Sequence, residues 1–386
     1  MTTTINKEQK NPNVPNLRFP EFEGEWQEKR LSDIADLSKG IGISKDQLSA
    51  DGEPCILYGE LYTKYKSETI KEVISKTNID NTKLVKSKAN DVIIPCSGET
   101  AEEIATARCV LKDDILLGGD LNIIRLHGYD GSFMSYQLNG KRKYDIAKVA
   151  QGVSVVHLYG EHLKNIKTIN PSLNEQKKIA NLLSLLDERI STQNKIIEDL
   201  KKLKCAIAER LFNATDGDSV PLTEVCTILK GKQINGEFLS EKGKYYVMNG
   251  GTEPSGYYDK SNAPADTISI SEGGNSCGYI QYNREAFWSG GHCYTLNNIT
   301  PNVCKLYLYH NLKSQESSIM KLRIGTGLPN IQKKDLEKFC ILLPSKAKQE
   351  SISTFLTAIE SKIANEEMLQ NYFQEEKLYL LRQMFI

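Results

Sequence analysis

Two stretches of the chain carry apolar residues at helical spacing over an unusual length. Within residues 171–213 and again within 344–386, apolar side chains recur at intervals of three and four positions, the period of one helix face. After an initial proline, neither stretch contains proline or glycine. Because about 40 helical residues extend roughly 60 Å, each stretch predicts a long helix whose narrow apolar stripe requires a partner helix.

The two stretches are copies of one motif. PSLNEQKKI begins at Pro171 and PSKAKQESI at Pro344, an offset of 173 residues. Ser172 with Glu175 predicts a capping box, whereas Lys348 in the second copy makes that helix start weaker. The apolar seam of the two spacer helices is expected to comprise Ile179, Leu183, Leu186, Ile190, Ile197, Leu200, Ile352, Leu356, Ile359, Ile363, Phe373 and Leu380.

Each copy is the natural partner of the other. If the duplicated halves are related by a pseudo-two-fold axis, the helices must run antiparallel. Polar residues interrupt the seam, and we hypothesise that Lys204 meets Glu366 across it. These side chains could equally extend to solvent.

The segment before each long helix predicts a globular domain, here called a head, that contains both strands and short helices. Short β-branched runs at 91–95, 121–126 and 267–271 predict strands, and short helices are expected at 133–138 and 305–313. The predicted fold is α+β, with two globular domains separated by two long antiparallel coiled-coil helices in a pseudo-two-fold tandem repeat. The expected limits are a flexible leader at 1–16, a first domain at 17–170, helices at 171–213 and 344–386, and a second domain at 218–343.

Composition favours a globular protein over a disordered or membrane-spanning one. The 386 residues contain 39% hydrophobic and 25% charged positions, typical of a globular chain. The 49 basic residues balance 49 acidic ones, which disfavours a chain that coats nucleic acid indiscriminately. No apolar run is long enough to span a membrane, and the first residues lack a secretory core, so a cytoplasmic location is expected. The nine scattered cysteines predict reduced, mostly buried thiols.

Motifs for catalysis are missing. The chain has no phosphate-binding loop, no dinucleotide-binding glycine motif and no nucleophile elbow. Its five histidines show no metal-ligand spacing. We therefore expect no catalytic residues, no metal and no cofactor in this chain.

Several loops mix aromatic, basic and amide side chains, which can contact DNA phosphates and base edges. An alternative for each such loop is an ordinary solvated surface. The expected DNA contacts are Tyr58, Tyr62, Lys64, Tyr65, Lys66, Ser97, Lys141, Arg142, Lys143, Lys244, Tyr245, Asn249, Tyr257, Lys260, Asn275, Arg284 and Arg323.

With these features together, the chain resembles the specificity subunit of a type I restriction-modification system. The opening LRFPEF at residues 17–22, the two P-S-x-x-x-Q-x-x-I helix starts and GTGLPNI at residues 325–331 carry the resemblance. In the first half, GVSVVH at 152–157 stands in place of the last motif.

The resemblance implies a non-catalytic, sequence-specific DNA-binding subunit. Each domain would be a target-recognition domain for one half of a split, asymmetric double-stranded DNA sequence, and the helices would set the gap. Two methyltransferase subunits would bring S-adenosylmethionine, and restriction subunits would bring ATP and Mg. The alternatives are an enzyme with a degenerate site and a coiled-coil protein-interaction scaffold that reads no DNA.

Overall fold

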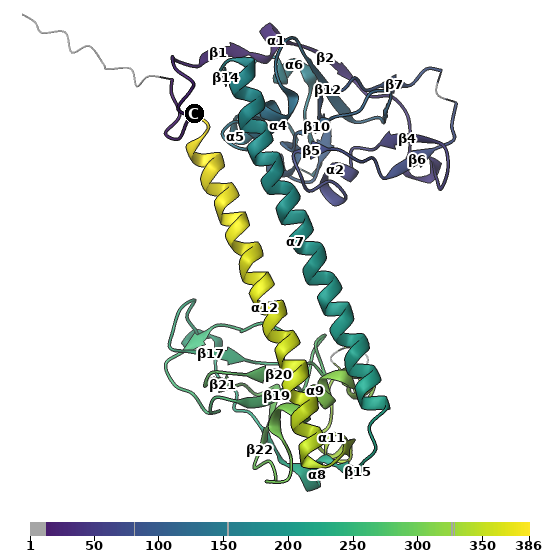
Figure 1. Cartoon of the computed structure of the whole chain (residues 1–386), viewed down its shortest axis with the longest axis vertical. Coiled ribbons are helices and arrows are strands. Elements are labelled where there is room, and N and C mark those ends of the chain that lie inside the picture. The colour runs from purple at the N-terminus through teal and green to yellow at the C-terminus, as the bar shows by residue number, and fades with distance from the viewer. Residues whose placement is uncertain (1–12, 81, 153, 326, 328) are drawn as a thin grey trace, which may run out of the picture. The chain divides into compact units, whose positions relative to one another are not determined.

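The computed structural model describes residues 13–80, 82–152, 154–325, 327 and 329–386. The chain forms two compact units, one of Met1–Asn194 with Leu369–Ile386 and one of Lys195–Met368. Each unit contains a globular head and a part of both long helices (Figure 1). Within the described ranges, no helix has the length and apolar character needed to cross a bilayer.

The two predicted long helices are present. They are α7 (Leu173–Asn213) and α12 (Lys346–Gln383), of 41 and 38 residues. Their uninterrupted helix-forming sequences explain their length. All twelve expected seam residues are buried or half-buried: Ile179, Leu183, Ile197, Ile352, Leu356 and Ile363 are buried, and Leu186, Ile190, Leu200, Ile359, Phe373 and Leu380 are half-buried.

The helices run antiparallel in each unit, as expected. In the first unit, Leu183 of α7 lies in one apolar cluster with Met384, which directly follows α12. In the second unit, Ala208 near the end of α7 packs with Ile352 and Leu356 near the start of α12. The start of each helix therefore meets the end of the other.

The start of α7 differs from the expected capping box. The Ser172 hydroxyl accepts a hydrogen bond from the Glu175 N–H at 3.4 Å. The Glu175 carboxylate instead binds Arg18 through two bonds of 2.8 Å and accepts from the Trp26 indole at 3.3 Å. The LRFPEF opening is thus anchored on this helix start. Residues 1–12 of the expected leader lie outside the described residues, and the Asn13 carbonyl accepts from the Trp26 N–H.

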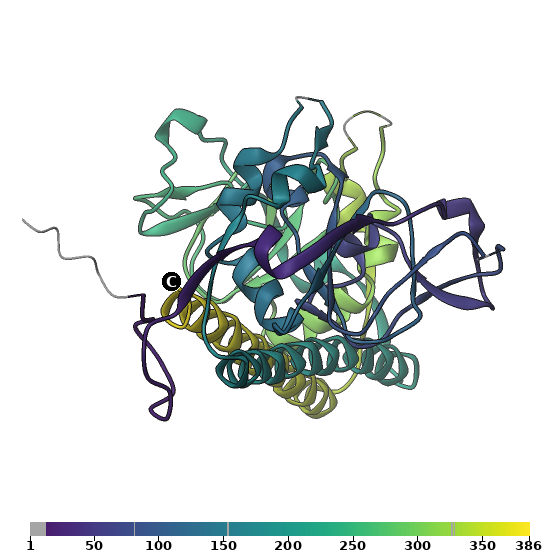
Figure 2. The same ribbon diagram turned by 90° about the horizontal axis from the view of Figure 1, so that it is seen from above.

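The first head contains two five-stranded sheets and short helices, and it packs against the first part of α7 within its own unit (Figure 1, Figure 2). One sheet has the order β2 (Ala35–Lys39), β12 (Leu121–Leu126), β8 (Asp91–Pro95), β10 (Arg108–Val110) and β5 (Thr69–Ile70). The other has the order β3 (Leu48–Ser49), β6 (Ser75–Thr77), β4 (Glu53–Ile56), β11 (Leu116–Leu117) and β7 (Val85–Lys86). The helical segments are α1 (Leu31–Ile34), η1 (Lys45–Gln47), α2 (Glu60–Thr63), α3 (Ala101–Ile104), α4 (Gly131–Asn139), α5 (Lys143–Val149) and α6 (Gly160–Leu163).

The second head is built on a smaller version of the same frame. Its larger sheet has the order β16 (Thr227–Lys230), β22 (Cys293–Asn297), β19 (Thr267–Ser271) and β20 (Ile280–Asn283). A second sheet has the order β18 (Tyr257–Tyr258), β17 (Tyr245–Met248) and β21 (Trp288–Ser289). The helical segments are α8 (Leu222–Val225), η2 (Gly236–Phe238), α9 (Lys305–Ser314), α10 (Glu316–Met320) and α11 (Lys333–Glu337).

The predicted strands and short helices are confirmed as β8, β12, β19, α4 and α9. A two-stranded antiparallel ribbon leads into each long helix. It pairs β1 (Gln27–Arg30) with β14 (Lys167–Asn170) in the first head, and β15 (Asp218–Pro221) with β23 (Cys340–Leu343) in the second. The remaining pair joins β13 (Val156–His157) to β9 (Ser97–Gly98). The duplication seen in the helices therefore extends to the strands beside them.

Equivalent glutamines tie each head to its helix. Gln176 accepts from the Asp130 N–H at the start of α4 and donates to the Pro171 carbonyl, at 2.9 and 2.8 Å. Gln349 accepts from the Cys304 N–H at the start of α9 and donates to the Pro344 carbonyl, both at 2.8 Å. The glutamine of the P-S-x-x-x-Q motif thus holds the start of a head helix in both copies.

Candidate nucleic-acid interface

One edge of the first head gathers polar side chains from several strands. Strand register brings the end of β2, the end of β8 and the start of β12 together, because β12 is antiparallel to both neighbours. There the Ser97 hydroxyl donates to the Asp120 carboxylate at 3.0 Å. The Lys39 ammonium lies 5.6 Å from the Tyr159 ring centre, within cation–π range. We call Lys39, Ser97, Asp120, His157 and Tyr159 the first polar edge.

The second head has an equivalent edge. Lys230 ends β16, Glu272 follows β19, and His292 precedes β22. The Lys230 ammonium lies 2.6 Å from one Glu272 carboxylate oxygen, and the His292 ring nitrogen lies 3.5 Å from the other. Asn249 accepts from the His292 N–H at 3.3 Å. We call Lys230, Glu272, His292 and Asn249 the second polar edge.

The second polar edge rests on a buried tyrosine. The Tyr294 hydroxyl shares its one hydrogen between the Glu272 carboxylate at 3.0 Å and the Ile331 carbonyl at 3.1 Å. Burial, with the hydrogen bond to Glu272, raises the pKa of Tyr294 above its ordinary value. The hydroxyl therefore stays protonated and donates, which fixes a carboxylate that is itself buried.

A glycine makes each edge possible. A side-chain carbon on Gly40 would lie 2.0 Å from the Gly118 carbonyl oxygen, and one on Gly231 would lie 2.2 Å from the Gly290 oxygen. These two glycines follow the lysines of the two edges in sequence. Any larger residue would force the first strand away from the paired glycines, and the polar groups would separate.

Comparison with known proteins decides the family. The sequence model described as the type I restriction modification DNA specificity domain matches residues 23–202 and again 216–372. The chain belongs to this specificity family. The duplicated match follows the duplicated frame of strands and long helices.

Individual relatives agree with this assignment. A putative type I specificity subunit of Mycoplasma genitalium is 36% identical over 138 residues, which cover 35% of this chain and 36% of that protein. The specificity subunit of the type I restriction enzyme MjaVIII of Methanocaldococcus jannaschii is 28% identical, covering 61% of this chain and 57% of its own length. The chain thus spans about a third of the first of these relatives and over half of the second.

A solved structure shows the same fold. The crystal structure of the S subunit of a type I restriction-modification system from M. genitalium matches with a TM-score of 0.70 at 21% identity. The match covers 97% of this chain and 99% of that one.

Among the residues expected to contact DNA in this specificity-family chain, Ser97 belongs to the first polar edge and Tyr62 contacts it. The Tyr62 hydroxyl donates to the Ser97 carbonyl at 3.1 Å, and burial raises the pKa of Tyr62. Lys66 donates to the Tyr62 carbonyl at 3.0 Å. Tyr58 is exposed two residues before the short helix α2.

Two other residues of that segment, Tyr65 and Lys64, contact residues of the head itself. Tyr65 is only 6% exposed and belongs to an apolar cluster, and burial raises its pKa to about 12. Tyr65 therefore lies in the core of the head, and its contact with DNA stays a prediction. Lys64 forms an ion pair with Glu60 at 2.7 Å and donates to Ser75 at 2.6 Å.

The basic run 141–143 lies by the helices. Arg142 donates to the carbonyl of Ile386 at 3.1 Å. Lys143 lines a hollow together with Glu68, Arg108 and Lys377. Lys141 is exposed. This run therefore lies beside the end of α12, away from the contacts that define the first polar edge.

The expected residues of the second head do not gather in one place. Asn249 belongs to the second polar edge. Tyr257 and Arg284 line one shallow hollow, and the Lys244 ammonium lies 5.2 Å from the Tyr245 ring centre. The side chains of Lys260, Asn275 and Arg323 are exposed.

Sequence reasoning missed most of the two polar edges. Lys39, Asp120, His157, Tyr159, Lys230, Glu272 and His292 were absent from the expected contacts. A signal existed, since LSKG at 37–40 and ILKG at 228–231 echo each other, as do Gly118-Gly119 and Gly290-Gly291. Only strand pairing brings these separate echoes together.

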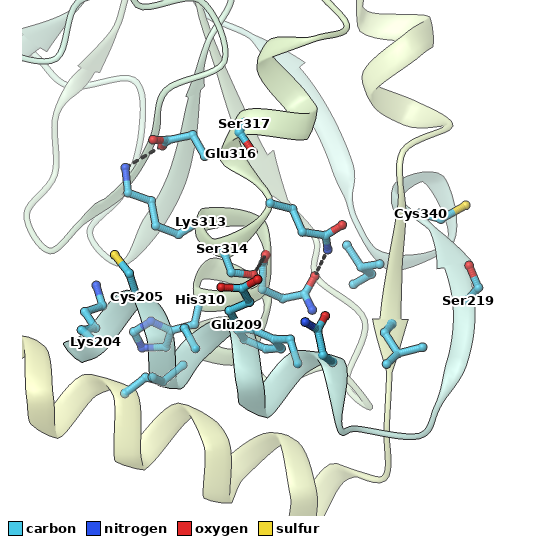
Figure 3. Close-up of a pocket in the computed structure, with 18 residues that line it drawn as sticks. Lys204, Cys205, Glu209, Ser219, His310, Lys313, Ser314, Glu316, Ser317 and Cys340 are labelled. Carbon is cyan, nitrogen blue, oxygen red and sulfur yellow. Dashed lines mark hydrogen bonds and ion pairs between the residues drawn. The ribbon is translucent and has the colours of Figure 1, made fainter. Parts of the chain in front are cut away.

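A hollow of the second unit is lined partly by titratable side chains. This cavity of about 810 Å³ lies between the end of α7, α9 and β23, and Lys204, Cys205, Glu209 and His310 line it (Figure 3). The His310 ring forms a hydrogen bond of 2.9 Å with the Thr357 hydroxyl. Burial lowers the pKa of His310 to about 4. The imidazole is thus neutral and already engaged.

Metal-ligand clusters and cysteine thiols are the other candidates for chemistry among the described residues. Within them, no group of three or more His, Cys, Asp or Glu side chains could hold a metal ion. The nine cysteines are free thiols and six of them are buried, as expected. Burial raises the pKa of Cys109 to about 12 and that of Cys55 to about 11, which disfavours the reactive thiolate.

Proposed function

We propose that this chain is the DNA-specificity subunit of a type I restriction-modification complex and reads a split, asymmetric double-stranded target. The observation that carries the proposal is the pair of polar edges, placed equivalently on two heads and built from different side chains. Lysine, histidine and asparagine can donate to base edges, whereas Asp120 and Glu272 can accept from exocyclic amines. Equivalent placement with different chemistry suits a protein that reads two different half-sites.

The long helices would set the gap and hold partners. Large apolar side chains remain exposed on them in both units, which is typical of a partner-binding surface. They are Leu173, Leu185, Leu369, Tyr372, Leu378 and Tyr379 in the first unit, and Ile196, Leu203, Phe355 and Met368 in the second. We propose that two methyltransferase subunits bind there, and that restriction subunits join this core.

The chain itself would carry no catalysis. The partner subunits would supply S-adenosylmethionine, ATP and Mg. The formal net charge of zero fits a subunit whose partners neutralise many of the DNA phosphates, so the chain alone should bind DNA weakly and with little salt dependence.

A protection experiment tests this function. The chain assembled with its methyltransferase subunits is expected to protect two short blocks of a cognate duplex, separated by an unprotected gap. Half-sites about one helical turn, or roughly 34 Å, apart would lie on one face of the duplex. One continuous block, or none, would favour a coiled-coil scaffold without DNA readout, and methylation or cleavage by the purified chain alone would favour an enzyme.

A further inference from the structure

A half-buried lysine of the first unit lies where α12, α7 and α4 meet. The Lys377 ammonium of α12 lies 2.6 Å from the Asp187 carboxylate of α7 and 2.6 Å from the Glu68 carboxylate. The Tyr136 hydroxyl of α4 donates to the same Asp187 at 2.7 Å. Although burial lowers it, the two carboxylates keep the pKa of Lys377 above its ordinary value. The lysine is therefore charged. We call Lys377, Asp187 and Tyr136 the first clasp.

The second unit contains the same arrangement. The Lys204 ammonium of α7 forms an ion pair with Glu360 of α12. The Tyr309 hydroxyl of α9 donates to Glu360 at 3.1 Å. The side chains of Lys204 and Glu360 are 19% and 21% exposed. We call Lys204, Glu360 and Tyr309 the second clasp.

The two clasps are copies related by the repeat. Lys204 and Lys377, Asp187 and Glu360, and Tyr136 and Tyr309 are each separated by 173 residues, the offset of the helix motif. The helices exchange roles, since α7 gives the carboxylate to the first clasp and the lysine to the second. The tyrosine is notable because it comes from head segments that are otherwise poorly matched. The hypothesis of a Lys204–Glu366 contact assumed a different pair: Lys204 pairs with Glu360, and Glu366 pairs with Lys362 on its own helix.

The clasps specify the register of the two helices, which the apolar seam alone does not. Leucine and isoleucine recur along both helices, so a seam shifted by one turn would still bury apolar surface. A shift of one turn, about 5.4 Å, would separate each lysine from its carboxylate and leave buried charges unpaired. The tyrosine of each clasp also attaches the head helix, α4 or α9, to the pair of long helices. The hydrogen bonds of Gln176 and Gln349 hold the start of the same head helix.

We propose that the two clasps are positioning elements that fix the register of α7 against α12 and seat each head helix on that pair, so that they determine the gap between the half-sites. This inference rests on the proposed DNA readout. Lys204 and Lys377 then act through the geometry of the heads and touch no DNA.

The test compares gap preference, which a purely stabilising contact would not change. The chain with Lys204→Met and Lys377→Met is assembled with its methyltransferase subunits and offered duplexes whose gap is native, one base pair longer or one base pair shorter. Lys202→Met is the matched control, because Lys202 forms an exposed ion pair with Glu198 on α7 alone. The clasp variant should lose most of the preference for the native gap while reading the same half-sites, and the control should keep it.

Further variants separate the possible failures. If the lysine variant does not fold, Tyr136→Phe with Tyr309→Phe removes only the two hydroxyls and should broaden gap preference in the same direction. Lys204→Glu alone should also broaden the gap preference. Adding Glu360→Lys, which exchanges the two charges of the second clasp, should restore the preference for the native gap. A folded clasp variant with unchanged gap preference overturns the clasp proposal, whereas a wild-type complex that protects no paired blocks overturns the proposed function.

Discussion

Single residues determine how the LRFPEF opening of the chain is attached to the first long helix. Arg18 belongs to the LRFPEF opening and Trp26 follows it, and both bind Glu175 at the start of α7. The Glu175 side chain is 1% exposed and that of Arg18 is 12% exposed. Their pair therefore lies where loss of one charge leaves the other unsolvated.

We predict that Arg18→Met destabilises the first unit. The change leaves the buried Glu175 without its cation, and the expected loss is about 3 kcal/mol in the free energy of unfolding. Urea denaturation followed by circular dichroism measures it. Lys178→Met is the control, because the Lys178–Glu21 pair is half exposed and should contribute less than about 1 kcal/mol. Equal losses in the two variants would contradict the prediction.

A second prediction concerns acid stability of the second unit. The folded pKa of His310 is about 4, below its ordinary value of 6.5, because burial disfavours the charged ring more than nearby Glu360 favours it and Lys204 opposes it further. As pH falls from 6.5 to 4, the unfolded chain takes up a proton that the folded chain does not. His310 should therefore remove about 3 kcal/mol of stability across this window.

The variant His310→Gln checks this contribution. Gln137 occupies the equivalent position in the first head, 173 residues earlier, so glutamine suits this site. Relative to the wild type, the variant should lose less stability between pH 6.5 and pH 4 in unfolding series at matched salt. Parallel pH profiles for the two proteins would show that His310 does not titrate as described.

Among whole elements, the long helices have the most direct functional consequence. Each is continuous from one compact unit into the other, so its length is a property of the chain that a local insertion can change. Their antiparallel pairing means that an insertion in one helix needs a matched insertion in the other.

We predict that a matched helical turn changes the gap alone. Roughly four residues are inserted within 191–204 of α7 and at the repeat-related place within 364–377 of α12. The assembled methyltransferase should then modify targets with a longer gap and unchanged half-sites, measured by methylation-sensitive sequencing. The same insertion in α7 alone should lower stability, because it breaks the register of the clasps. Altered half-site sequences in the matched variant would contradict the spacer role.

The whole molecule combines one repeated frame with two different heads. The two heads share a sheet pattern, a ribbon before each long helix and a glycine beneath each polar edge. They differ at the sheet margin, since the first head adds the parallel strand β5 beside β10, and β20 is the last strand of the corresponding sheet in the second. The sheet margins, which differ between the heads, are therefore attached to sheets and ribbons that the heads share.

This organisation predicts that the heads are exchangeable. Replacing residues 17–170 with the first head of another family member should change one half-site and leave the other half-site unchanged. Methylation-sensitive sequencing of a host that expresses the chimaera with its partner subunits measures both. A change in both half-sites would mean that the heads do not read DNA independently.

The sequence by itself determined the elements that depend on local pattern. Helical periodicity without glycine or proline specified α7 and α12, and β-branched runs between turn residues specified β8, β12 and β19, because these signals act over a few neighbouring residues. The repeat offset also revealed the duplication.

Only the tertiary structure decided which distant side chains meet. The polar edges combine residues from separate strands, and Lys377 of the first clasp also pairs with Glu68, 309 positions away in the chain. It also placed Tyr65 in the core, and it bound Glu175 to Arg18, although the local motif favoured a capping box. Such contacts follow from strand register and helix packing, which minimise buried unpaired charge across the whole unit and leave no mark within a short stretch of sequence.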